Sequence, residues 1–166
     1  METLHYQVWE SPIGSLLLVA SAKGLMRLDF LHQESEVERI QTRHAAEWIE
    51  SASKLAPYRR ELEEYFAGRR REFTFPLDLR GTEFQRQCWQ ALLGIPYGET
   101  RSYADIARAI RKPKAVRAVG GANHQNPVAI VVPCHRVIGS SGSLTGYGGG
   151  LPLKEKLLLL EGARLF

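Results

Sequence analysis

The chain has 166 residues, of which 44% are hydrophobic and 24% charged, as in a folded protein of one usual domain or two small ones. No apolar run approaches the length that crosses a bilayer, and the start, Met1–Tyr6, lacks the pattern of a signal peptide. Two cysteines, Cys88 and Cys134, are too few for a disulfide framework, and no Cys-x-x-Cys metal spacing exists. We therefore expect an intracellular, cytoplasmic protein without a membrane anchor or a metal.

The first part of the chain alternates short apolar segments with turn residues, which predicts strands in an antiparallel meander. These segments are residues 4–9, 16–20 and 25–30. Helical patterns follow at 34–49 and at 52–67, the second ended by Gly68. Residues 73–79 are expected to be an extended link. We assign 1–78 to an N-terminal α/β domain with a structural role.

The second part, residues 79–166, is predicted to be mainly helical. Thr82–Gln85 has the sequence of a capping box and starts a helix whose inward face includes Cys88, most simply a core residue. Two short helices, 103–110 and 114–123, are joined by about three residues, which indicates a helix-turn-helix. Together the two parts predict an α+β fold, with a small antiparallel sheet in the N-terminal domain.

Positive charge is concentrated around this predicted helix-turn-helix. The chain has a net charge of +4, and residues 101–117 hold six basic residues against one acid, Asp105. The basic residues are Arg101, Arg108, Arg111, Lys112, Lys114 and Arg117. A concentrated basic surface is typical of polyanion binding, although a solvated helix face gives the same pattern.

The segment Val131–Ile138 places a cysteine beside a histidine behind a proline. The apolar, β-branched residues 128–132 predict a buried strand, which Pro133 ends because proline has no N–H to donate. Cys134 and His135 are then expected in a turn at a strand end, the strand-turn active site of this fold. A thiol attacks as its thiolate, and a nearby imidazole favours that form. A buried structural cysteine beside a surface histidine remains the alternative.

This segment resembles the active-site signature of the O6-alkylguanine-DNA alkyltransferases, which repair alkylated guanine by accepting the alkyl group on cysteine. The resemblance covers most of the chain from Phe84 onward, whereas the first eighty or so residues match only loosely. The further matching blocks are 98–103, 117–123, 126–128, 141–142, 145–150, 154–158 and 161–162. Some family members carry a structural zinc in the N-terminal half, but this half has no cysteine, so we expect no metal and no cofactor.

The resemblance implies roles for individual residues. Cys134 would be the nucleophile and alkyl acceptor, His135 its base, Glu161 the group that orients His135, and Asn126 the tie between the recognition helix and the active-site loop. The base pocket would comprise Val137, Tyr147, Gly148 and Gly149. Some members carry serine where this chain has Gly148, so only the backbone N–H could contact O6 there.

The resemblance also implies docking in the minor groove of DNA, followed by extrusion of the damaged nucleotide. Arg117 would fill the gap and Tyr103 would crowd the backbone near the flipped nucleotide. Lys112, Lys114 and Ser140 would contact DNA. Small residues of the second helix could serve both internal packing and close approach to the groove.

The implied function is irreversible, stoichiometric transfer of an alkyl group from O6-alkylguanine, and also from O4-alkylthymine, in double-stranded DNA to Cys134. We expect a monomer, and cooperative binding along DNA is left open. Three alternatives remain: a cysteine hydrolase using Cys134 and His135, a non-catalytic sensor of alkylated DNA, and a regulator switched by alkylation. Lack of N-terminal metal-binding cysteines speaks against the regulator.

Overall fold

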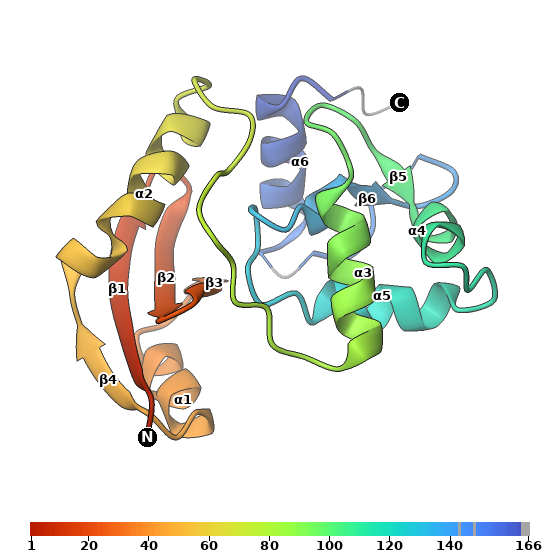
Figure 1. Cartoon of the computed structure of the whole chain (residues 1–166). Helices are drawn as coiled ribbons and strands as arrows, with labels where there is room; N and C mark the ends of the chain where they lie inside the picture. The colour runs from red at the N-terminus through yellow and green to blue at the C-terminus, as the bar shows by residue number, and fades with distance from the viewer. Residues whose placement is uncertain (143, 148, 164–166) are drawn as a thin grey trace. The chain divides into compact units, whose positions relative to one another are not determined.

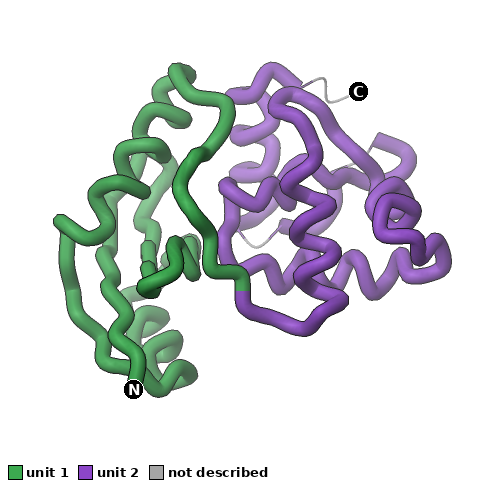
Figure 2. The backbone as a smooth tube through the Cα atoms, viewed as in Figure 1, with its two compact units in different colours: residues 1–79 green, residues 80–166 purple. Residues whose placement is uncertain are grey.

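A computed structural model describes residues 1–142, 144–147 and 149–163, and its elements mix strands and helices as the sequence predicts (Figure 1). The chain divides into two compact units, residues 1–79 and 80–166 (Figure 2). No helix among the described residues is long and apolar enough to cross a membrane.

Unit 1 is built on a four-stranded sheet. Strands β1 (Thr3–Ser11), β2 (Gly14–Ser21) and β3 (Gly24–Phe30) form the predicted antiparallel meander. A fourth strand, β4 (Glu47–Glu50), pairs parallel with β1, so the order across the sheet is β3-β2-β1-β4. Residues 16–20 of β2 are all buried, which fits its position inside the sheet.

The core of unit 1 is apolar. Leu4, Leu17, Val19 and Met26 form one buried cluster, and Ile40 packs against it. Helix α2 (Ala52–Phe66) packs against β1 and β2 and buries Leu55, Leu62 and Tyr65. Gly68 follows α2 with a φ of +74° and donates its N–H to the carbonyl of Tyr65, as predicted for a helix end.

The helix predicted over 34–49 is wrong in its second half. Helix α1 spans only Ser35–Arg43, and the chain turns extended at His44 before entering β4. The exposed edge of β1 offers backbone groups that pair with this segment: Glu47 donates to the carbonyl of Glu2, and Ser51 donates to that of Tyr6. Tertiary pairing thus overrides the local helical pattern.

Unit 2 packs three helices together at its centre. Helix α3 (Glu83–Leu93) begins with the predicted capping box, in which Thr82 and Gln85 each accept from the other's backbone N–H. The two predicted short helices are α4 (Tyr103–Ala109) and α5 (Val116–His124). A bond from the Trp89 indole to the Ala122 carbonyl, 2.9 Å long, joins α3 to α5.

A short sheet connects the helix-turn-helix to the cysteine segment. Strand β5 (Arg101–Ser102) leads directly into α4 and pairs parallel with β6 (Val137–Ile138), which follows the cysteine turn. Helix α6 (Leu151–Leu160) contacts that turn from the C-terminal side. Figure 1 shows β5 and β6 beside each other within this unit.

Candidate active site and nucleic-acid interface

Cys134 lies in a helical turn that follows several consecutive tight turns. The strand predicted over 128–132 is absent, because Val131 and Val132 donate their N–H groups to carbonyls of their own segment. Ile130 has a φ of +73°, a conformation that β-branched residues rarely adopt. Cys134–Arg136 form one turn of 3-10 helix, and β6 begins after it. The strand beside the nucleophile therefore follows it in sequence.

Asn126 explains this local fold. Its side-chain amide donates to the Val132 carbonyl at 2.8 Å, and its side-chain oxygen accepts from the Val128 N–H at 3.0 Å. The same side chain is hydrogen-bonded to the Cys134 thiol. Because α5 ends at His124, Asn126 fastens the cysteine segment to the end of that helix.

His135, Arg136 and Glu161 form a buried charged cluster. His135 Nε2 lies 2.8 Å from Glu161 Oε2, and both side chains are inaccessible to solvent. Arg136 binds both oxygens of the same carboxylate, at 2.8 and 2.9 Å, and donates to the Ile95 carbonyl at 2.7 Å. The backbone of Gly98, which has a φ of +83°, approaches Glu161 closely: a Cβ added at Gly98 would lie only 3.1 Å from the Glu161 carbonyl oxygen.

The cluster fixes the protonation of His135. Burial opposes ionisation of Glu161, but hydrogen bonds from His135 and Arg136 lower its pKa to about 2. Burial lowers the pKa of His135, although Glu161 raises it, so the imidazole is neutral near pH 7. An ionised carboxylate only accepts, so Nε2 carries the proton and Nδ1 carries the lone pair. Nδ1 is buried and has no hydrogen-bond partner within the described part of the chain.

The Cys134 thiol is also buried. Burial raises its pKa to about 11, whereas the hydrogen bond from Asn126 and the charge of Lys154 lower it. Adjacent residues of a 3-10 helix point about 120° apart, so Cys134 and His135 extend in different directions.

Sequence reasoning missed Arg136, Lys154 and Thr145 as members of this site. Lys154 is fully buried on α6 and donates to the carbonyls of Val137 and Thr145, at 2.5 and 3.1 Å. One signal could have found it: Lys154 shares the helical spacing of the buried Leu157 and Leu158, so it occupies a core position.

Of the predicted base pocket, Val137 and Tyr147 lie at the same turn. Tyr147 meets the His135 ring edge to face, with ring centroids 6.5 Å apart. Val137 is buried, and Gly149 is half-buried in a turn before α6. Gly148 lies outside the described residues. Tyr103, at the start of α4, bonds through its hydroxyl to the Thr145 hydroxyl at 2.7 Å, which links α4 to the segment after β6.

The predicted DNA-contacting residues are on the surface of unit 2. Arg117, Lys112, Lys114 and Ser140 are exposed, as is Arg111 in the turn between α4 and α5. Two of the six basic residues are paired with acids: Arg101 with Glu99 at 3.0 Å, and Arg108 with Asp105. Lys112 donates to Gln87 on α3 at 2.8 Å. The basic side chains around the helix-turn-helix are thus fully or partly exposed to solvent.

Helix α5 has two distinct faces. Val119, Ala122 and Asn123 are buried, whereas the exposed residues include Arg117, Ala118 and Gly121. Neither Gly120 nor Gly121 has an atom within 4 Å of the position that a Cβ would take. Internal packing therefore does not require glycine at these two positions, whereas the buried Ala122 fits the packing face predicted for this helix.

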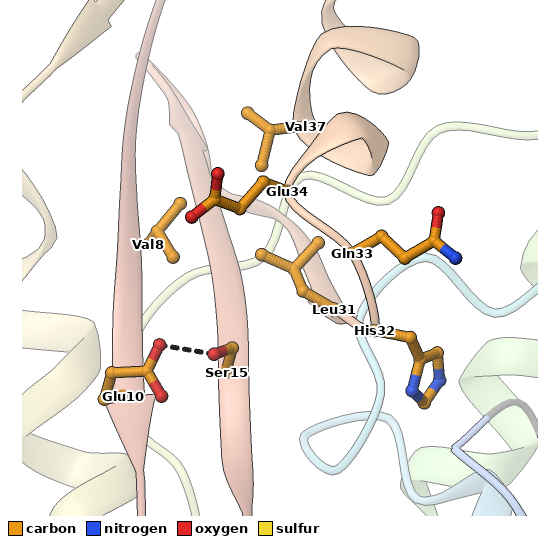
Figure 3. A pocket seen from close by; sticks show the side chains of 8 residues that line it. All are labelled: Val8, Glu10, Ser15, Leu31, His32, Gln33, Glu34 and Val37. Atoms are coloured by element: carbon orange, nitrogen blue, oxygen red, sulfur yellow. Dashed lines mark hydrogen bonds between the residues drawn. The ribbon is translucent and has the colours of Figure 1, made fainter.

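Unit 1 has a hollow of about 390 Å³ between β1, β2 and the start of α1. Its lining residues, shown in Figure 3, are Val8, Glu10, Ser15, Leu31, His32, Gln33, Glu34 and Val37. Glu10 accepts a hydrogen bond from Ser15, and the Glu34 carboxylate points towards Val8, away from His32 (Figure 3). The lining has no thiol, so its chemistry differs from that around Cys134.

Models of one protein family match both units. Residues 83–163 match the 6-O-methylguanine DNA methyltransferase, DNA binding domain, and residues 4–79 match the ribonuclease-like domain of the same proteins. The chain belongs to the 6-O-methylguanine DNA methyltransferase family. The family match thus extends to residues 4–79, where the sequence motifs resemble the family only loosely.

Individual relatives agree over nearly the whole length. The methylated-DNA–protein-cysteine methyltransferase of Methanosarcina barkeri is 51% identical, over 95% of this chain and 97% of its own. That of Mycobacterium tuberculosis is 50% identical, over 97% and 94%. A crystal structure of Mycobacterium tuberculosis OGT in complex with DNA matches with a TM-score of 0.85 at 49% identity, over 95% of this chain and 92% of that one. The predicted family and α+β fold are confirmed.

Proposed function

We propose that this protein repairs DNA by moving the alkyl group of O6-alkylguanine in a duplex onto Cys134. The observation that carries the proposal is the buried arrangement of Cys134 beside a neutral His135 whose Nε2 is held by ionised Glu161. The family and the named relatives support the same chemistry.

The reaction needs the thiolate, which the buried site disfavours at rest. His135 Nδ1 takes the thiol proton, and because the two side chains diverge, the proton passes through an intervening solvent molecule. Sulfur then forms a bond to the alkyl carbon while the carbon–O6 bond breaks. The bonding electron pair stays on guanine, and a proton from the imidazolium, returned through solvent, leaves the base neutral.

The resulting thioether is stable, and the one other cysteine of the sequence, Cys88, is buried on α3. Each molecule therefore acts once. O4-alkylthymine presents the same kind of alkyl–oxygen bond and is included in the proposal.

The DNA-binding part of the proposal rests on the exposed face of α5 and the basic residues around it. Lys112, Lys114 and Ser140 contact phosphates, and affinity falls with added salt because counterions are released. Arg117 is the long side chain among small exposed neighbours and fills the space left by the extruded nucleotide. Tyr103 lies at the junction of α4 and the loop after β6, where the flipped nucleotide would enter.

The base pocket is formed by the Val137 carbonyl, the Tyr147 ring and the Gly149 backbone. The Val137 carbonyl already accepts from Lys154, and its second lone pair is available to the guanine amino group. We include in the proposal an intracellular monomer whose N-terminal unit is structural.

The test mixes the protein with duplex DNA that carries one O6-methylguanine. We expect one methyl mass increment on the peptide that contains Cys134, and none in Cys134→Ala, which should bind the duplex as wild type does. Methyl transfer with repeated turnover would show that the thioether is not the end point. Binding without transfer would favour the sensor, and hydrolysis of an acyl ester without DNA would favour the hydrolase.

A further inference from the structure

Lys154 is a buried cation that the reaction described above does not use. It lies on α6 with no exposed surface, and its ammonium donates to the carbonyls of Val137 and Thr145. Both acceptors belong to the segment that follows the cysteine turn. Lys154 therefore joins α6 to the wall of the proposed alkyl-transfer site.

A lysine at this position is costly. Its neighbours along the buried stripe are Leu157 and Leu158, and an apolar side chain would continue that stripe. Burial lowers the pKa of Lys154 to about 8, although Cys134 raises it, so the ammonium still predominates at neutral pH. A buried charge that weakens the fold is expected where chemistry needs it.

The charge of Lys154 acts on the nucleophile. It lowers the pKa of Cys134, and the thiolate in turn favours the ammonium. Within the described part of the chain, Asn126 is the other polar side chain at the thiol, and the neighbouring His135 is bonded to Glu161, at the C-terminal end of α6, which also pairs with Arg136. Asn126 and resting His135 are neutral, and the Arg136 charge is held by both oxygens of Glu161.

We propose that Lys154 is a positioning residue for Cys134, whose fixed positive charge stabilises the thiolate while its hydrogen bonds hold the Val137 and Thr145 carbonyls. Thr145 extends the connection further, because its hydroxyl is bonded to Tyr103 on α4. The same lysine thus joins the nucleophile, the base pocket and the first helix of the helix-turn-helix. This inference deepens the proposed function and rests on it.

The test measures thiol reactivity without DNA, in a Cys88→Ala background so that one cysteine reacts. The rate of Cys134 alkylation by iodoacetamide is followed from pH 6 to pH 11 in wild type, Lys154→Met, Lys154→Gln and Lys154→Arg. Lys156→Met is the matched control, because Lys156 is an exposed lysine of the same helix. Methyl transfer from the O6-methylguanine duplex is measured on the same proteins.

Removing the charge should raise the apparent pKa of the thiol by about one unit or more, and so slow alkylation about tenfold at neutral pH. Lys154→Met and Lys154→Gln should both show this shift, and methyl transfer should slow by a similar factor. Lys154→Arg should keep the wild-type midpoint, and Lys156→Met should match wild type throughout.

Two results would overturn the inference. A folded Lys154→Met protein with the wild-type pH profile would show that the charge does not act on Cys134. Failure of both Lys154→Met and Lys154→Gln to fold would show that the lysine serves the structure. A wild-type protein that alkylates with iodoacetamide but accepts no methyl group from DNA would instead refute the proposed function, and the pH comparison would still decide the role of Lys154.

Discussion

Among the described residues, unit 1 buries no charged side chain, whereas unit 2 buries five side chains that are charged or strongly polar. The five are Asn123, His135, Arg136, Lys154 and Glu161. Burying apolar surface stabilises a fold directly, while a buried charge must recover its lost hydration through well-placed partners. This contrast fits the proposed function, in which unit 1 is structural and residues of unit 2 carry out the alkyl transfer.

The largest effect is expected for Glu161→Gln, which removes one charge from the buried cluster of unit 2. Three donors of His135 and Arg136 point at the two carboxylate oxygens. An amide supplies one acceptor, and its NH₂ group favours the tautomer of His135 that protonates Nδ1, which then cannot accept the thiol proton. We expect single-turnover methyl transfer to slow by at least about 100-fold, measured with the O6-methylguanine duplex.

The stability of Glu161→Gln should also fall, by about 3–5 kcal/mol, because the Arg136 charge is left without its full partner. Urea unfolding measures this change. Glu155→Gln is the control, since Glu155 is exposed on the same helix and should change neither quantity. Wild-type transfer by Glu161→Gln would show that Glu161 does not orient the base.

The corresponding change in unit 1 is Leu4→Ala. Leu4 is fully buried in the apolar cluster of the sheet, and truncating such a side chain costs about 2–5 kcal/mol. We expect the free energy of unfolding to fall by that amount, while the pH profile of Cys134 alkylation at a temperature where the protein stays folded is unchanged. A shifted profile would show that unit 1 influences the chemistry.

The difference between the units also explains what the sequence could predict. The three strands of the meander and helix α2 could be predicted from local sequence, because the apolar residues of each element recur at the spacing of a strand or a helix. Strand β4 could not be predicted in this way, since its four residues become a strand only by pairing with the edge of β1. The strand predicted over 128–132 is wrong because an apolar, β-branched run that is buried in turns has the same composition as a buried strand.

For the site, the family resemblance pointed to Cys134, His135, Glu161 and Asn126, whereas spacing alone would not have joined residues 35 positions apart. The ion pairs that bring His135 and Glu161 together depend on Arg136 and on how α6 packs, which no local pattern records. Lys154 could in principle have been identified from the sequence, as a charged residue at a core position of its helix.

Arg117→Ala tests the proposed DNA-binding surface of unit 2. If Arg117 replaces the extruded nucleotide, its loss should slow methyl transfer from the duplex about tenfold or more, with little change for the free O6-benzylguanine base, which needs no flipping. Single-turnover rates on both substrates measure the effect. Lys114→Ala is the comparison variant: it should weaken duplex binding and its salt dependence, yet transfer normally at saturating protein. Equal losses on both substrates would assign Arg117 a structural role.

Gly121→Ala is expected to give the smallest effect and to separate folding from binding on a single helix. Gly121 is exposed on α5, and a Cβ there would meet no atom within 4 Å. Alanine is favoured over glycine in a helix by about 0.8–1.0 kcal/mol, so the free energy of unfolding in urea should rise by up to that amount. If glycine is present to let DNA approach the backbone, the affinity for an undamaged duplex should fall at the same time, as fluorescence anisotropy at fixed salt would measure. A variant that gains stability and keeps its affinity would show that this part of α5 does not lie against the DNA.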